Sequence, residues 1–235
     1  MSRALAIETS GRIGSVALLD ESGGIQEREF PHGLQHAAGL IPLIDEMCGQ
    51  RAWRAADLRE VYVSAGPGSF TGLRIGITLA KTLAFVTGAK LVAVPTMRVL
   101  VENAPPEARH VIIVLDAKRD QIFTARFERV EQRWIEREPP HLDSLTAMMS
   151  RSARPLYLIG EGIPFHQQHI AKDDGIVITD QQAWRARASV LARIGAQMAR
   201  AGEFVDPFLL EPIYIRVPEA QEKLEAKQRS TSCNT

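Results

Sequence analysis

The sequence predicts an α/β protein made of two successive lobes, each with the element order βββαβα. Three observations favour this class. Short strand-like segments separated by glycine turns open the chain, helical and strand-like periods then alternate, and the same order starts again near residue 110. A length of 235 residues also allows two modest hydrophobic cores.

The first lobe is expected to contain five strands and two helices. The strands run from Ala4 to Ile7, Ile13 to Leu19, Ile25 to Phe30, Val61 to Ala65 and Leu91 to Val94. The helices run from His36 to Gln50, where apolar residues recur at helical spacing, and from Gly72 to Val86. Pro42 is expected to kink the first helix or to mark its true first turn.

The second lobe repeats this order with different residues. The expected strands are Val111 to Leu115, Gln121 to Arg129, Trp134 to Arg137, Leu156 to Ile159 and Ile176 to Ile178. The expected helices are Leu142 to Met149, a short one near Phe165, and Ser189 to Ala201. Two βββαβα units in succession are the pattern of the duplicated actin-like ATPase fold, which is also described as ribonuclease-H-like.

The domain organisation follows from this repeat. Lobe one is expected over residues 1–101 and lobe two over residues 102–216, and the final helix can pack back on lobe one. An extended closing segment ends at Arg216. Residues 217–235 are charged, then rich in Ser and Thr, and lack an apolar face, so we expect a flexible tail.

Composition and charge exclude several classes of protein. Lys plus Arg equals Asp plus Glu at 28 each, so the chain lacks the positive field of an autonomous nucleic-acid binder. No basic and apolar leader and no run of about 18 apolar residues is present, which argues against secretion and a membrane span. Cys48 and Cys233 have no metal-ligand spacing. We therefore expect a cytoplasmic protein.

The most specific motif is the segment Gly66 to Gly76, which joins a buried strand to a helix. Two glycines flanking Pro67 make a tight turn with free backbone amides, and the helix N-terminus behind it favours an anion such as phosphate. The segment matches neither the P-loop nor the dinucleotide-binding pattern. Alternatively, the glycines only let the loop turn and the helix pack closely.

The motifs taken together resemble the bacterial TsaB (YeaZ) family. They are Gly66 to Gly76 with Ala80-Lys81, Ala6 to Ser10 before Ser15 to Leu18, His36 ahead of Leu40 to Ile44, Leu115 to Arg119, Gly160-Glu161-Gly162, and Pro212 to Arg216. The resemblance covers nearly the whole chain. It implies a partner subunit in the synthesis of threonylcarbamoyladenosine on tRNA.

The resemblance also implies a mode of action. The chain would be a non-catalytic subunit that binds and stabilises the threonylcarbamoyl transferase TsaD in a heterodimer, with the ATPase TsaE joining them. It could form a homodimer when alone, and tRNA would be contacted only through the complex. The alternative is a stand-alone small-molecule kinase or ATPase of the same fold, with Glu8 and Asp116 holding magnesium and the Gly66 loop holding phosphate.

No resident cofactor is expected, although weak ATP or ADP binding at a subunit boundary stays open. A weak or vestigial nucleotide site would comprise Glu8, Thr9, Gly66, Gly68, Asp116, Gly160 and Gly162. In actin-like ATPases an aspartate ends the first strand, and the longer Glu8 stands there in this chain. No nucleophile, base and orienting group can be assembled, so no catalytic residue is assigned.

No metal site is predicted either. Thr96 and Leu100 stand where the catalytic relative carries two metal-binding histidines, and neither can hold a transition metal in their place. His32 and His36 share that spacing but lie in a loop and at a helix start. His166 and His169 are interpreted as surface residues.

The predicted partner surface lies on the two helices of lobe one. The helix from Gly72 to Val86 is apolar nearly all round, and small residues recur along it every four positions, so a second helix could approach closely. The interface residues are expected to be Leu40, Leu43, Leu73, Gly76, Ile77 and Ala80. The alternative is that the small residues along this helix face the chain's own sheet.

Overall fold

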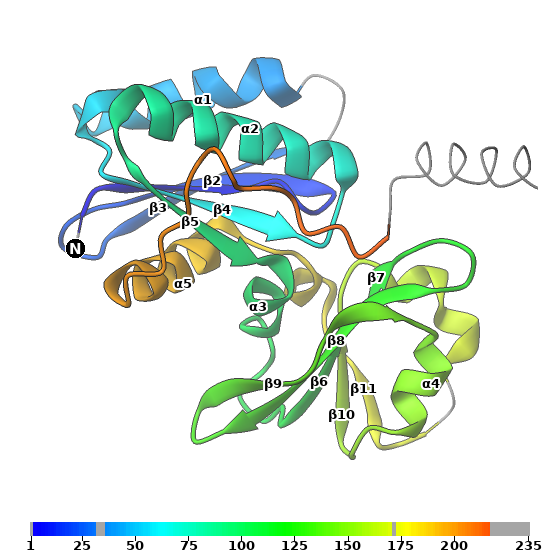
Figure 1. Ribbon diagram of the computed structural model, residues 1–235. Coiled ribbons are helices and arrows are strands. Elements are labelled where there is room, and N and C mark those ends of the chain that lie inside the picture. Colours follow the sequence, from blue (N-terminus) through cyan, green and yellow to red (C-terminus); the bar gives the residue numbers. More distant parts are fainter. Residues whose placement is uncertain (1, 32–35, 171–172, 217–235) are drawn as a thin grey trace, which may run out of the picture.

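Two sheets organise the molecule, one in each lobe. The computed structural model describes residues 2–31, 36–170 and 173–216. Figure 1 shows the first sheet with its helices above and the second sheet below it, with the chain passing between them through α3 (Thr96–Val101). The proposed tail at 217–235 and His32 lie outside the described residues, as does the side chain of His36.

Lobe one has a five-stranded sheet in the order β3-β2-β1-β4-β5. Its strands are β1 (Ala4–Glu8), β2 (Ile13–Leu19), β3 (Ile25–Pro31), β4 (Glu60–Gly66) and β5 (Lys90–Pro95). The first three are antiparallel neighbours, and β4 and β5 run parallel to β1. The connections carry α1 (His36–Gln50), the short η1 (Ala55–Asp57) and α2 (Phe70–Thr87).

Lobe two repeats this topology. Its strands are β6 (His110–Ile113), β7 (Leu115–Asp116), β8 (Ile122–Val130), β9 (Arg133–Asp143), β10 (Leu156–Ile159) and β11 (Ile176–Ile178). Strand β6 is antiparallel to β8 and parallel to β10, just as β1 is antiparallel to β2 and parallel to β4. The predicted duplication is therefore confirmed.

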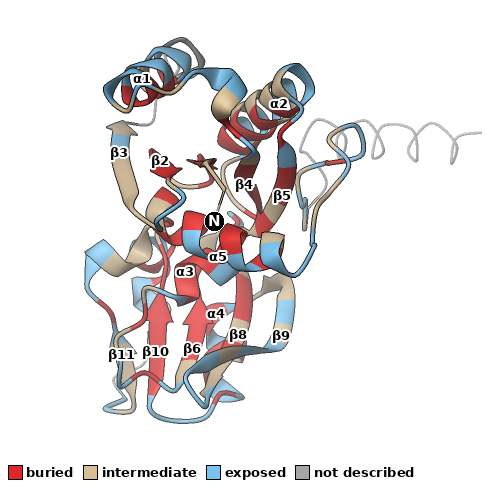
Figure 2. Ribbon diagram, turned by 90° about the vertical axis from the view of Figure 1, so that its left-hand side faces the viewer, coloured by how far each residue is buried: buried red, intermediate tan, exposed pale blue. Residues whose placement is uncertain are grey.

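The helices of lobe two are shorter except for the last. They are α4 (Leu145–Ser150), η2 (Ile163–Phe165), η3 (Gln167–His169), η4 (Gln181–Trp184) and α5 (Ala188–Arg200). Although α5 belongs to lobe two in sequence, it packs across the sheet of lobe one on the face opposite α1 and α2 (Figure 2). A Cβ on Gly195 would lie 2.4 Å from the Tyr62 ring, so only glycine lets α5 approach β4 this closely.

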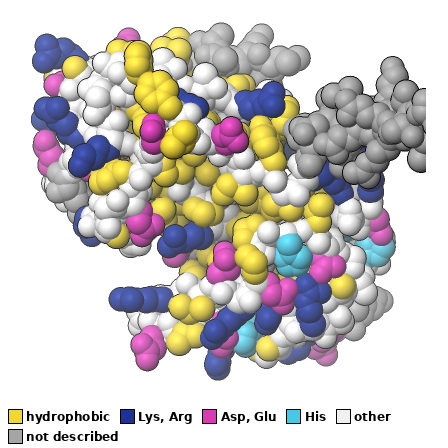
Figure 3. All heavy atoms as spheres, viewed as in Figure 1, with side chains coloured by type: hydrophobic (Ala, Val, Ile, Leu, Met, Phe, Trp, Pro, Cys, Tyr) yellow, Lys and Arg dark blue, Asp and Glu magenta, His cyan; other side chains and the backbone are white. Residues whose placement is uncertain are grey.

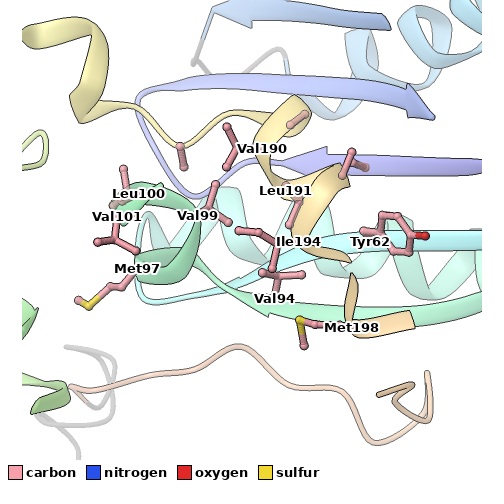
Figure 4. Packing of buried hydrophobic residues seen from close by; sticks show 14 of the residues in the cluster. Tyr62, Val94, Met97, Val99, Leu100, Val101, Val190, Leu191, Ile194 and Met198 are labelled. Carbon is pink, nitrogen blue, oxygen red and sulfur yellow. The ribbon is translucent and has the colours of Figure 1, made fainter. Parts of the chain in front are cut away.

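One hydrophobic core connects the two lobes. It joins residues of the first sheet, such as Val94, to α3, α5 and the start of the second sheet at Val111. Figure 4 shows side chains from α3 and α5 meeting beneath the first sheet. Burial of this apolar surface stabilises the fold by about 25 cal/mol for each Å². Because both lobes contribute to the core, the stability of each lobe depends on the other.

A returning segment after α5 runs back along lobe one. Val205 pairs with Leu91 of β5, the Lys81 ammonium donates to the Leu210 carbonyl at 3.1 Å, and the Ile213 amide donates to the Ala65 carbonyl at 2.7 Å. The segment ends near lobe two, where the Arg216 guanidinium donates to the Ala117 carbonyl. The expected closing segment is thus present and touches both lobes.

Helix α2 is long and apolar enough to satisfy the composition test for a membrane-crossing helix, alone among the helices in the described ranges. Ser69 caps its N-terminus by accepting a hydrogen bond from the Gly72 amide at 3.2 Å, and Gly88 ends it in a left-handed conformation. Its inner side packs on the sheet of lobe one. One side of α2 therefore belongs to the core of lobe one, while its outer side, which carries Phe85 and Val86, is exposed.

The structure differs from the sequence prediction in several elements. Pro42 lies inside α1, which excludes the first-turn alternative and leaves the predicted kink open. The short helix α3 was not predicted, because six apolar and polar residues after β5 carry too little periodicity to reveal it. Strand β9 extends to Asp143, well beyond the Trp134 to Arg137 expected, because its whole length pairs with β8.

Candidate functional site

Glu8 is a fully buried carboxylate at the end of β1. One of its oxygens accepts hydrogen bonds from the Ser10 amide at 2.7 Å and from the Ser10 hydroxyl at 2.5 Å, and the other accepts from Ser64 on β4. Burial raises its pKa above the ordinary glutamate value, although these hydrogen bonds oppose the shift. Its acceptors are therefore engaged inside lobe one.

The Gly66 loop packs against the turn that follows β1. The Ser69 amide donates to the Ser10 carbonyl at 2.7 Å, and a Cβ on Gly68 would lie 2.5 Å from the same oxygen. Gly66 has a φ of +108°, which favours glycine. Two of the amides expected to be free, those of Ser69 and Gly72, are bonded within the chain.

Gly160 and Gly162 serve close packing in lobe two. A Cβ on Gly160 would lie 2.2 Å from the Val114 carbonyl oxygen, and one on Gly162 would lie 2.5 Å from the Asp116 amide. Between them, Glu161 reaches across to lobe one and accepts a hydrogen bond from the Arg12 amide at 2.9 Å. The loop therefore joins the lobes at the turn between β1 and β2.

Asp116 lies at the same seam on the side of lobe two. It accepts hydrogen bonds from the Lys118 amide at 3.1 Å and from His166 Nε2 at 3.3 Å, and pairs with the Lys118 ammonium at 2.8 Å. Burial works to raise the pKa of Asp116, but these partners outweigh it and hold the pKa below the usual aspartate value. The carboxylate is thus ionised and paired at neutral pH.

The predicted nucleotide-site residues gather at the seam between the lobes. Glu8, Thr9, Gly66 and Gly68 lie on the lobe-one side, and Asp116, Gly160 and Gly162 lie on the lobe-two side. Sequence reasoning missed Arg12, whose guanidinium lies 4.9 Å from the Phe165 ring centre and so adds a second link between the lobes. A lone arginine in a strand turn gave no signal for this role.

The two positions assigned to the relative's metal histidines are internal. Thr96 and Leu100 are both on α3 and are buried in the core that joins the lobes. The Thr96 hydroxyl has no hydrogen-bond partner within the described part of the chain. A histidine pair here would need a different packing of α3.

His166 corrects the sequence interpretation of two surface histidines. His169 is partly exposed, but His166 is buried at 2% exposure because η2 and η3 fold over it. The spacing of three residues next to two glutamines suggested a polar surface turn. Burial of one ring was not visible in that pattern.

The predicted partner-interface residues also need correction. Leu40, Leu73, Gly76, Ile77 and Ala80 are buried against the sheet of lobe one, and Leu43 is half-buried beside them. A Cβ on Gly76 would lie 2.2 Å from the Thr9 hydroxyl oxygen at the end of β1. The stripe of small residues therefore lets α2 approach its own sheet, which is the alternative that the sequence left open.

The outer sides of the same helices form an exposed apolar groove, named here the α1–α2 groove. It is lined by Leu40, Ile41, Arg74, Ile75, Thr78, Leu79 and Thr82. At its end the Arg74 guanidinium stacks on Phe70 at 3.9 Å and donates to the Tyr214 hydroxyl at 3.0 Å. Figure 3 shows hydrophobic side chains gathered on the face of lobe one that carries α2 and the returning segment.

Comparison with known proteins decides the family. The family model described as "TsaD: tRNA N6-adenosine threonylcarbamoyltransferase" matches residues 17–183, which reach into both lobes. A Bacillus subtilis protein named "tRNA threonylcarbamoyladenosine biosynthesis protein TsaB" is 30% identical over 96% of this chain and 99% of its own length. The chain belongs to the TsaB (YeaZ) family. The Escherichia coli TsaB is 26% identical over 96% of this chain and all of its own.

Solved structures support the same fold. YeaZ from Pseudomonas aeruginosa superposes with a TM-score of 0.76 at 23% sequence identity, covering 91% of this chain and all of its own. A second Pseudomonas aeruginosa structure, described as similar to peptidase YEAZ, gives a TM-score of 0.77 at 22% identity and covers 92% of this chain and all of its own. The actin-like arrangement of two lobes is thus shared with the YeaZ structures.

Proposed function

We propose that this chain is an accessory subunit in tRNA threonylcarbamoyladenosine biosynthesis, which acts by docking on the transferase TsaD and performs no group transfer itself. The named biosynthetic relatives along nearly the whole chain supply the pathway. One observation carries the docking role. The Glu8 and Glu161 carboxylates at the seam between the lobes are bonded within the chain, whereas the apolar α1–α2 groove is open to solvent.

The seam supports the absence of an activity of its own. An actin-like phosphotransferase needs a free carboxylate for the metal and free amides for phosphate. Here Glu8 is held by Ser10 and Ser64, and the Ser69 amide is held by the Ser10 carbonyl. Thr96 and Leu100 supply no metal ligands of the kind the transferase relative uses. The function therefore does not depend on a bound nucleotide.

The α1–α2 groove supplies the docking surface of the proposal. Its apolar floor and the cluster of Arg74, Phe70 and Tyr214 at its end have the composition of an interface hot spot, in which aromatic and arginine side chains dominate. The same groove could join two copies of the chain when TsaD is absent. In either case the contact lies on lobe one.

The substitution Ile41→Glu tests the surface. Ile41 is 59% exposed on α1, so a charge there leaves the monomer folded but would be stranded in a dry contact with TsaD. We expect the variant to bind TsaD from the same cells at least about tenfold more weakly, a loss of about 1.4 kcal/mol. Titration calorimetry of the two purified proteins measures the affinity.

A matched variant on the other lobe controls for the added charge. Ile178→Glu places the same substitution at a 41% exposed isoleucine of β11. It should bind TsaD as the unaltered chain does. Unchanged affinity for Ile41→Glu, or an equal loss in both variants, contradicts docking through the α1–α2 groove.

A further inference from the structure

Two histidines and one aspartate converge on a single point in lobe two, next to Asp116. They are Asp120, from the turn between β7 and β8, His166, which directly precedes η3, and His169, which is the last residue of η3. Each residue offers one ligand atom, and the three atoms all lie within 4.8 Å of one another. His169 Nε2 is 2.7 Å from the Asp120 carboxylate, and His166 Nδ1 is 3.8 Å from the same oxygen.

The His166 ring is oriented for a ligand that its neighbours do not supply. Its Nε2 faces the Asp116 carboxylate at 3.3 Å, and because a carboxylate only accepts, Nε2 must carry the proton. In the neutral ring Nδ1 is then left with a lone pair. That nitrogen is buried, has no hydrogen-bond partner within the described residues, and lies on the side of Asp120.

A buried nitrogen lone pair without a donor is costly, since burial removes water and nothing replaces it. The arrangement has the form of a metal-ligating histidine, in which the second ring nitrogen donates to a carboxylate that fixes the tautomer. Asp116 is that carboxylate, and Lys118 holds it in place at 2.8 Å.

We propose that Asp120, His166 and His169 bind one divalent transition metal ion of the zinc class, with Asp116 as the supporting carboxylate. Two imidazoles and one carboxylate suit zinc, which takes three protein ligands and leaves a fourth position to water. Ligand atoms about 2.1 Å from zinc in a tetrahedron lie about 3.4 Å apart, so the present separations require only small side-chain movements. Asp120 is 65% exposed and free to make them.

The site differs from any metal position inferred from the catalytic relatives. Those correspond to Thr96 and Leu100 on α3, in the core between the lobes, whereas this cluster lies on the turn and the η3 segment of lobe two. A bound ion would fasten the turn after β7 to η3. The Ala117 carbonyl and Gln121, which accept from Arg216 at the end of the returning segment, belong to that same turn.

The test is zinc titration of the untagged, metal-stripped full chain in a Cys233→Ser background, which removes the thiol near the C-terminus as a competing ligand. Calorimetry should find one Zn²⁺ per chain, with His169 in the tautomer that frees Nε2, the nitrogen facing Asp120, for the ion. Co²⁺ should give the visible absorption of a low-coordinate site. Bound zinc should also raise the Tm.

Substitutions then locate the ion. His169→Gln and Asp120→Asn change partly exposed groups, so they should leave the fold intact while weakening zinc binding at least about tenfold and abolishing the rise in Tm. Asp116→Asn should weaken binding by about 10- to 100-fold, the usual effect of losing a supporting carboxylate.

His141→Gln is the matched control. His141 also has two carboxylates nearby, those of Glu138 and Asp143, but Arg151 already pairs with both at 2.8 and 2.6 Å. This variant should bind zinc as the parent does. The proposal is overturned if the parent takes up no zinc, if His169→Gln and Asp120→Asn retain its affinity, or if His141→Gln alone removes binding.

Discussion

The buried carboxyl of Glu8 makes the stability of lobe one depend on pH. Because its pKa is raised in the folded chain, the folded state holds this proton more tightly than the unfolded state does. The contribution of the Glu8 carboxyl to the free energy of unfolding is fully present below the ordinary glutamate pKa. It is lost as pH rises through the folded-state pKa.

Glu8→Gln should remove that dependence. The amide oxygen can still accept from Ser10, and the amide nitrogen can donate to the Ser64 hydroxyl, so the packing is kept without a buried charge. We expect the variant to gain stability relative to the parent as pH rises from 5 to 8, by at most about 1.4 kcal/mol per pH unit. Urea unfolding at several pH values measures the difference.

Glu27 provides the opposite case as a control. Burial works to raise its pKa, but hydrogen bonds from the Ser189 amide at 3.0 Å and from Arg187 outweigh burial and lower it. Glu27→Gln should therefore cost most at neutral pH and less as pH falls. A difference between Glu8→Gln and the parent that stays constant over this pH range would contradict a raised pKa at Glu8.

At the scale of the element, α2 is fitted to its sheet by the absence of a side chain at Gly76. Gly76→Ala should destabilise the chain by about 1–3 kcal/mol, because the new Cβ would lie 2.2 Å from the Thr9 hydroxyl oxygen. Thermal unfolding followed by circular dichroism measures this loss.

Gly49→Ala in α1 is the comparison. Nothing lies within 4 Å of a Cβ built there, so the substitution should stabilise its helix by about 0.5 kcal/mol through the better helix propensity of alanine. Equal changes in stability for Gly76→Ala and Gly49→Ala would show that α2 does not need to approach β1 so closely.

The sequence predicted most elements but not which side of α2 faces inward. Periods of two and 3.6 residues located the longer strands and helices, since one face of each is buried, but missed short elements such as α3 and η1. Helix α2 is apolar on several sides, so periodicity could not separate buried Ile77 from half-buried Ile75. The burial of His166 depends on the folding of η2 and η3, for which short polar segments carry no pattern.

At the scale of the whole molecule, the two lobes are joined in a way that favours a docking subunit. A single core runs through α3 and α5, Glu161 bonds to the Arg12 amide across the seam, and the returning segment touches both lobes. Actin-like enzymes depend on relative movement of their lobes around a ligand. Here the Glu8 and Asp116 carboxylates are bonded within their own lobes, and Glu161 bonds the lobes to each other.

Reconstituted modification of tRNA tests the central claim most directly. Threonylcarbamoyladenosine is measured after incubating tRNA and the threonylcarbamoyl adenylate donor with this chain alone, with TsaD alone, and with both proteins, TsaE and ATP being present in each case. We expect no product from this chain alone and markedly more product from the pair than from TsaD alone. Product formed by this chain without TsaD, or a TsaD rate that does not change when the chain is added, would contradict the account.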